Sequence, residues 1–121
     1  MSYGDEILHS LQGDVIDEID QLEDEIRLTM RSGKTVRILH HQDCCESVRI
    51  VGTDGDWKDI KGEILVSTSI SESSGGDAPS EYAESWTRTN IEFKTDSHTV
   101  ISRWIGTSNG YYSESLTIEQ L

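Results

Sequence analysis

Basic residues are scarce in this chain. It has 10 lysines and arginines against 23 aspartates and glutamates, so its 121 residues carry a net charge of −13. Such a charge repels nucleic-acid phosphates and anionic lipid surfaces within a Debye length of about 10 Å. We therefore expect neither direct nucleic-acid binding nor membrane binding. The charge is typical of a well-solvated surface and, in second place, of a surface that matches a basic protein partner.

Long hydrophobic runs are also missing, and none approaches the roughly 20 residues that a membrane-spanning helix needs. The start of the chain, residues 1–6, lacks the basic and apolar regions of a secretory signal, so we expect a cytosolic protein. The length suits a single domain over residues 1–121. Because only 34% of the residues are hydrophobic, the core must be thin or be extended by self-association, for instance in a homodimer.

Cysteine is rare, and the two cysteines, Cys44 and Cys45, are neighbours. A bridge between adjacent cysteines closes a strained ring, so the sequence predicts free thiols. Free thiols agree with a reducing compartment.

Alternating apolar residues predict a mostly β fold: an antiparallel sheet of about six or seven strands with a short N-terminal helix, an α+β fold being the alternative. The clearest signal is a hairpin of strands 24–31 and 34–41 around Gly33, which sets Leu28 opposite Val36 and Ile26 opposite Ile38. The same register brings Asp24 opposite His40.

Further elements follow from the same patterns. Strands are expected at 48–52, 64–70, 85–94, 99–106 and 111–118, and one helical turn at 57–60. Residues 14–21 fit a strand or a short helix, with strand favoured. The small polar residues 71–81, which include the only proline, predict a mobile loop.

The densest chemistry lies in seven residues, 40–46. Imidazole, thiolate and carboxylate groups bind metals, zinc above all, or move protons. In an extended strand, neighbouring side chains diverge, so at most two or three of these groups can meet one ion. Ligand or metal binding and a purely structural role both remain open for the candidate residues His40, His41, Asp43, Cys44, Cys45 and Glu46. No complete catalytic signature surrounds them, so we do not expect an enzyme.

A second segment, residues 104–114, contains the hairpin signal Asn109-Gly110 followed by two tyrosines. Tyr111 and Tyr112 offer stacking faces, and Glu114 offers a carboxylate, which together suit a planar ligand or a protein partner. Aromatic pairs that stabilise a sheet are the equally weighted alternative.

An acidic run precedes the first basic residue, Arg27. Ranks of carboxylates can imitate the phosphates of DNA and block a DNA-binding protein. The predicted partner-binding surface consists of Asp14, Asp17, Glu18, Asp20, Glu23, Asp24 and Glu25.

At the segments His40–Val48, which reads HHQDCCESV, and Trp104–Glu114, which reads WIGTSNGYYSE, the chain resembles an uncharacterised family of small phage-encoded domains. The resemblance covers roughly residues 11–118 and implies a viral or prophage origin but no reaction. It leads us to expect a small acidic protein that binds and inhibits a host factor, such as a CRISPR or restriction nuclease. The alternative is a domain that sequesters a signal molecule or metal in a pocket at residues 40–46.

Overall fold

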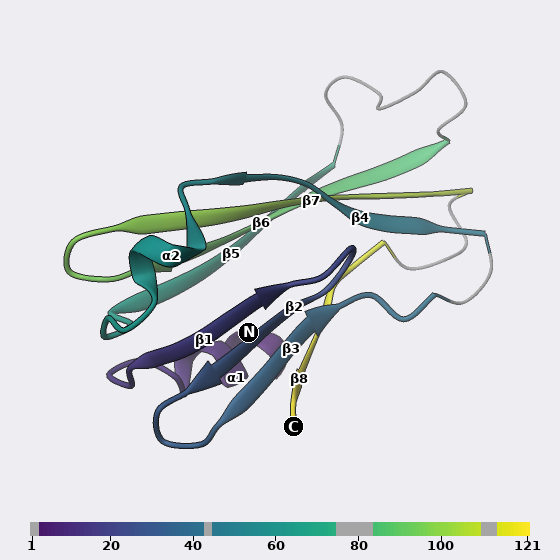
Figure 1. Cartoon of the computed structure of the whole chain (residues 1–121). Helices are drawn as coiled ribbons and strands as arrows, with labels where there is room; N and C mark the ends of the chain where they lie inside the picture. Colours follow the sequence, from purple (N-terminus) through teal and green to yellow (C-terminus); the bar gives the residue numbers. More distant parts are fainter. Residues whose placement is uncertain (1–2, 43–44, 75–83, 110–113) are drawn as a thin grey trace.

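The computed structural model describes residues 3–42, 45–74, 84–109 and 114–121, and in this part of the chain eight strands form two four-stranded antiparallel sheets. The sheets lie one above the other (Figure 1), with strand orders β1-β2-β3-β8 and β4-β7-β6-β5. The elements are α1 Tyr3–His9, β1 Ile16–Gln21, β2 Ile26–Met30, β3 Thr35–Leu39, β4 Ser47–Asp54, α2 Trp57–Ile60, β5 Ser67–Ser74, β6 Ser85–Lys94, β7 Thr99–Ser108 and β8 Thr117–Gln120. The predicted mostly β, antiparallel fold with a short N-terminal helix is confirmed.

The core lies between the sheets because each strand turns alternate apolar residues inward. Leu28 in β2, Phe93 in β6 and Trp104 in β7 are each at most 1% exposed. Helix α1 contacts β8 and β5, and it buries Leu8 in the same core. Neither helix in the described part of the chain is long and apolar enough to cross a membrane.

The predicted hairpin is confirmed in its register. Leu28 pairs with Val36 and Ile26 with Ile38, and Gly33 has a φ of 100° in the loop. The strands are shorter than expected, since β2 begins at Ile26 and β3 ends at Leu39. Asp24 and His40 therefore lie beyond the paired residues.

The other predicted elements are mostly present. Residues 16–21 form a strand, as favoured, and the helical turn at 57–60 and the strand at 85–94 have the predicted bounds. The strand expected at 64–70 begins at Ser67, because Ile64 forms an isolated bridge with Val15. Strand β5 continues to Ser74, so residues 71–74 are strand where we predicted loop. The remainder of that loop, residues 75–81, lies outside the described residues.

The hairpin predicted at Asn109-Gly110 is wrong. Strand β7 pairs with β4 and β6, whereas the next strand, β8, begins at Thr117 and pairs with β3 in the other sheet. The chain therefore crosses between the sheets after Ser108. It crosses in the opposite direction between β3 and β4, at the same end of the molecule, to the right in Figure 1.

Candidate functional site

The two crossovers bring the two sequence motifs together. Strand β3 pairs with β8 in one sheet, through Leu39 and Thr117, and β4 pairs with β7 in the other, through Ser47 and Thr107. The connection from β3 to β4 and the connection from β7 to β8 therefore run between the same two strand pairs. A cavity of about 480 Å³ lies there. It is lined by His40, His41, Gln42, Glu46, Ser115, Leu116 and Thr117.

His40 is held from one side of its ring. Its Nδ1 atom lies 2.8 Å from the carbonyl oxygen of Ser115, and a carbonyl only accepts, so Nδ1 carries the proton and donates. The other nitrogen, Nε2, is buried and has no hydrogen-bond partner among the described residues. It lies 3.5 Å from the Glu46 carboxylate. The ring orientation is thus fixed by the second crossover, while Nε2 faces a carboxylate.

Glu46 is among the most buried carboxylates in the described part of the chain. Its side chain is 1% exposed and that of His40 is 7% exposed. The Gln42 side-chain amide donates to the Glu46 carbonyl, which ties the two ends of the first crossover together. A buried carboxylate beside an oriented imidazole can hold a proton, a cation or a hydrogen-bonding ligand.

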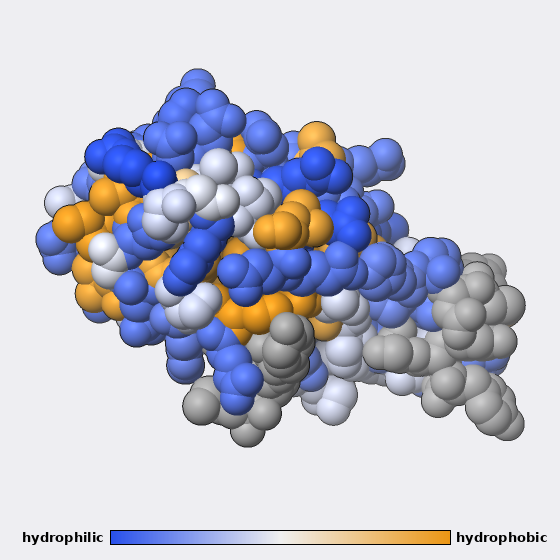
Figure 2. All heavy atoms as spheres, turned by 90° about the horizontal axis from the view of Figure 1, so that it is seen from below, coloured by the Kyte–Doolittle hydropathy of each residue, from blue (hydrophilic) through white to orange (hydrophobic). Residues whose placement is uncertain are grey.

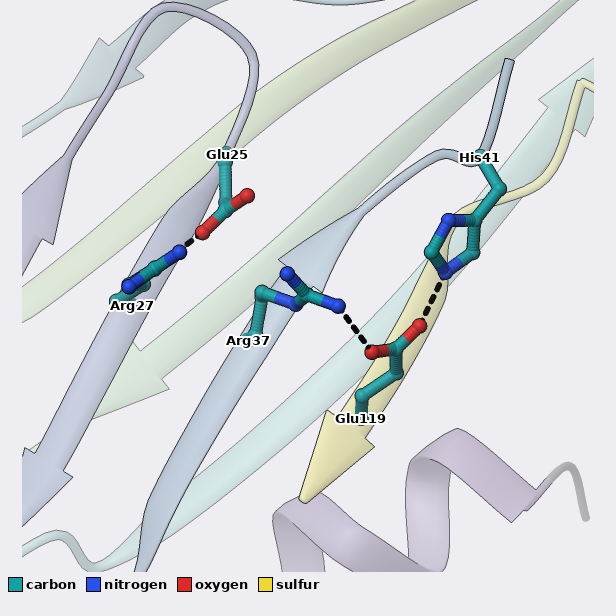
Figure 3. A network of polar contacts seen from close by, with 5 residues as sticks. All are labelled: Glu25, Arg27, Arg37, His41 and Glu119. Atoms are coloured by element: carbon teal, nitrogen blue, oxygen red, sulfur yellow. Dashed lines mark hydrogen bonds and ion pairs between the residues drawn. The ribbon is translucent and has the colours of Figure 1, made fainter. Parts of the chain in front are cut away.

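His41 points to the outer surface of the sheet β1-β2-β3-β8, which is the lower sheet in Figure 1 (Figure 3). There Glu119 accepts hydrogen bonds from Arg37, at 2.6 Å, and from His41. Arg37, followed by His41, holds the pKa of the Glu119 carboxyl below its usual value. His41 also lines the cavity, but its side chain is 59% exposed and is already paired with Glu119.

Glu114 is positioned by hydroxyl groups of the upper sheet. Its carboxylate accepts from Ser108 at 2.5 Å, from Thr87 at 2.8 Å and from Ser85. Burial acts to raise the pKa of Glu114, but the three hydroxyl hydrogen bonds outweigh it, so the pKa lies below the usual value. Glu114 does not line the cavity. It anchors the segment that supplies Ser115.

Gly106 explains why that anchor can sit so close to the sheet. A Cβ atom on Gly106 would lie 2.6 Å from the Glu114 carbonyl oxygen and 2.8 Å from the Glu114 Cβ. The described residues of the second motif therefore have structural roles: Trp104 is a core residue, Gly106 makes room, and Ser108 binds the Glu114 carboxylate.

The free-thiol prediction is wrong for Cys45, which is disulfide-bonded, and the described part of the chain contains no free cysteine. The chain has one other cysteine, Cys44. Our argument was that a bridge between adjacent cysteines closes a strained ring. Residues 44 and 45 lie between strand β3, which ends at Leu39, and strand β4, which begins at Ser47, and so outside the paired strands. The inference of a reducing compartment from free thiols loses its basis.

Four predicted site residues, Asp43, Cys44, Tyr111 and Tyr112, lie outside the described residues. Among those that are described, no three histidine, cysteine, aspartate or glutamate side chains surround a point that could hold a metal ion. His40 and Glu46 are the pair that the structure brings together.

The acidic run divides into paired and solvated residues. Ser32 donates to Asp14 and lowers the pKa of that carboxyl, while Glu25 pairs with Arg27 (Figure 3). The exposed members lie on β1 and in the following turn: Asp17, Glu18, Asp20, Glu23 and Asp24. On the face of the molecule seen from below, hydrophilic residues lie around and between hydrophobic patches (Figure 2).

Sequence reasoning missed four residues that line the cavity: Gln42, Ser115, Leu116 and Thr117. Gln42 lay inside the predicted segment, residues 40–46, but was not among the candidate residues. The role of Ser115 depends on its backbone carbonyl, which leaves no mark in a sequence. The pairing of β3 with β8 would have placed these residues near His40, but the hairpin that we wrongly predicted at Asn109-Gly110 hid this pairing.

The comparisons with known proteins agree with an uncharacterised family. No curated protein and no solved structure matches this chain. A family model described as "Domain of unknown function (DUF7448)" matches residues 9–118, and the chain therefore belongs to that family.

Proposed function

We propose that this domain binds a small polar ligand in the cavity between the two crossovers. The observation that carries the proposal is the buried His40–Glu46 pair beside a cavity of about 480 Å³. Ligand pockets commonly have volumes of about 300–1,000 Å³, with a few polar groups that fix the ligand's orientation. A buried polar atom without a partner is unfavourable in the free protein, so its presence supports a role in binding.

The lining indicates the chemistry of the ligand. Leu116 offers an apolar contact and Thr117 a hydroxyl group, while the Gln42 amide already donates to the Glu46 carbonyl. This mixture suits a compact molecule with both donor and acceptor groups, of the size of a metabolite or signal molecule.

The test is a fragment screen by NMR with isotope-labelled protein. Binding should shift the resonances of residues 115–117, and the change Thr117→Trp, which fills the cavity, should abolish it. Thr99→Trp places the same bulk on an exposed strand residue that does not line the cavity, so it should leave binding intact. A screen in which no compound shifts the cavity resonances, or in which both variants behave alike, contradicts the proposal.

A second candidate function rests on the exposed carboxylates of β1. We infer that a protein of phage origin with such a surface inhibits a basic host factor, for example a CRISPR or restriction nuclease, in the host cytosol. Three carboxylates, Asp17, Glu18 and Asp20, lie on a strand at the edge of its sheet, where they are accessible to a partner.

Phage plating on a host with an active defence system tests this candidate. Expression of the wild-type chain should restore plating, and Asp17→Lys, Glu18→Lys and Asp20→Lys together should remove the effect without changing the circular dichroism spectrum. Equal plating with and without the wild-type chain, across restriction and CRISPR hosts, argues against it.

A further inference from the structure

We propose that strand β5 pairs with the same strand of a second copy of this chain, antiparallel and about a two-fold axis. The two upper sheets then join into one continuous sheet of eight strands. This interface is separate from the proposed ligand site, because no residue of β5 lines the cavity.

Strand β5 differs from the other three sheet edges, each of which has a feature that discourages pairing with another strand. Strands β1 and β4 each contain a bulge, and β1 also carries three exposed carboxylates. Strand β8 is four residues long and contacts α1. Natural proteins protect edge strands by such bulges, charges, short lengths and covering elements. Strand β5, Ser67–Ser74, has eight residues, a regular register with β6, no proline and one charged residue, Glu72.

The backbone of β5 has an unpaired side. In an antiparallel pair, alternate residues direct their N–H and C=O groups to the neighbouring strand, and the residues between them direct theirs away. Within the described part of the chain, the backbone of residues 67–74 is hydrogen-bonded to β6 alone. Helix α1 contacts β5 but lies below it in Figure 1, at the height of the lower sheet. The open side of β5 therefore offers a row of donors and acceptors to another strand.

The side chains of β5 leave room for that strand. Thr68 is 7% exposed and faces the core, so the alternating residues Ser67, Ser69, Ser71 and Ser73 face outward. The last three of these serines are exposed. Because serine is small and uncharged, an incoming strand meets neither bulk nor like charge on this face.

Charge is balanced around β5, although the chain as a whole carries −13. Strands β5 and β6 contain two acidic residues, Glu72 and Glu92, and two basic residues, Arg88 and Lys94. The acidic strand β1 lies on the other side of the molecule, where one of its side chains accepts a hydrogen bond from Thr53 of β4. Strand β4 is the opposite edge of the upper sheet from β5. Two copies that meet through β5 therefore keep their β1 strands apart.

A second copy suits this edge because the sequence of β5 is compatible with itself. In a two-fold register centred on Ser71, Glu72 of each copy lies opposite Ile70 of the other, and Ser69 lies opposite Ser73. No two like charges are then directly opposite, an arrangement that would be destabilising. Such a contact uses the same surface of both copies, as in the two-fold dimers that are the commonest soluble oligomers.

Sedimentation equilibrium of the wild-type, full-length chain at rising concentration tests the proposal. The mean mass should rise from 13.6 kDa toward twice that value. Ser71→Lys and Ser73→Lys together place lysines of the two copies beside each other and should weaken the dimer by about 10-fold or more. Ser47→Lys with Thr99→Lys is the matched control: it adds the same charge to exposed residues of β4 and β7 in the same sheet and should dimerise as the wild type does.

Amide hydrogen exchange of the wild type locates the contact and decides the question even if the β5 variant fails to fold. As the concentration rises, the amides of residues 67–74 that are not bonded to β6 should exchange more slowly, and those of β1, β4 and β8 should not change. A wild-type chain that keeps the mass of a monomer at every concentration would overturn the proposal and leave β5 for an extended segment of another protein. A dimer that the β5 lysines weaken no more than the control lysines do, or one that protects another edge, would overturn it as well.

Discussion

At the scale of single residues, Gly106 and Glu114 determine where the second crossover lies. The Glu114 backbone rests directly on Gly106, where any side chain would overlap it. Since Ser115 follows Glu114 and accepts the hydrogen bond from His40, this contact also sets the geometry of the candidate site.

We predict that Gly106→Ala lowers the free energy of unfolding by about 1–3 kcal/mol, the usual effect of forcing extra volume into a packed region. The backbone of Glu114 must move, so the His40–Ser115 hydrogen bond should weaken as well. Gly52→Ala is the matched control, because a Cβ there meets nothing within 4 Å. Its stability should be unchanged or higher by up to about 1 kcal/mol. Urea denaturation of both variants checks the prediction, and equal midpoints would contradict it.

Residue chemistry was the part of the site that the sequence could reveal. His40 and Glu46 stood out because imidazole and carboxylate groups rarely cluster without a reason. The contact made by the Ser115 carbonyl could not be predicted, since every residue carries the same group. Glu114 was predicted as a ligand-binding residue, yet its carboxylate is engaged by hydroxyls from two strands, which only the pairing of β6 with β7 brings together.

At the scale of elements, the two crossovers are the features that distinguish this molecule from a simple meander. Strands β2 and β3 were predicted in register because both apolar faces coincide in one pairing only. The pair Asn109-Gly110 misled us, since its preference for tight turns is local and says nothing about which strand pairs with the next. The hydrogen bonds that the Glu114 carboxylate accepts from three hydroxyl groups of the upper sheet compete with the local preference of Asn109-Gly110 for a tight turn.

We predict that Glu114→Gln destabilises the protein near pH 7 by about 1.5–3 kcal/mol, as expected for hydrogen bonds to a charged group. The folded-state pKa of Glu114 lies below the ordinary value of 4.5, so its ionised form contributes stability above that value. This contribution is lost as pH falls through the lowered folded-state pKa. The variant should therefore lose less stability than the wild type between pH 7 and about pH 3.

Denaturant midpoints at several pH values measure this difference. Glu92→Gln in β6 serves as a control, since it removes one carboxylate from the same sheet outside the hydroxyl cluster. Parallel pH profiles for the wild type and Glu114→Gln would show that the hydroxyl contacts do not stabilise the ionised form.

At the scale of the whole molecule, the charge of −13 is distributed so that β1, an edge strand, carries only negative charges. Its exposed residues include Asp17, Glu18 and Asp20, and Arg27 of the neighbouring strand is paired with Glu25. The opposite edge of this sheet, β8, contacts α1. Edge strands invite pairing with another copy, and charges that repel a second copy prevent it.

We predict that neutralising β1 with Asp17→Asn, Glu18→Gln and Asp20→Asn together promotes self-association through this edge. Two copies of the wild-type strand would bring like charges opposite one another, whereas two copies of the variant would not. Light scattering after size exclusion should show a higher mean mass for the variant, rising with protein concentration. Glu23→Gln, Asp24→Asn and Asp96→Asn remove the same net charge from exposed turns and should leave the mass unchanged. If both triple variants have the mass of the wild type, the edge carboxylates do not act against self-association, and binding a basic partner becomes the stronger explanation for their position. If the wild type is itself a dimer that dissociates when β1 is neutralised, our assignment of a repulsive role is wrong.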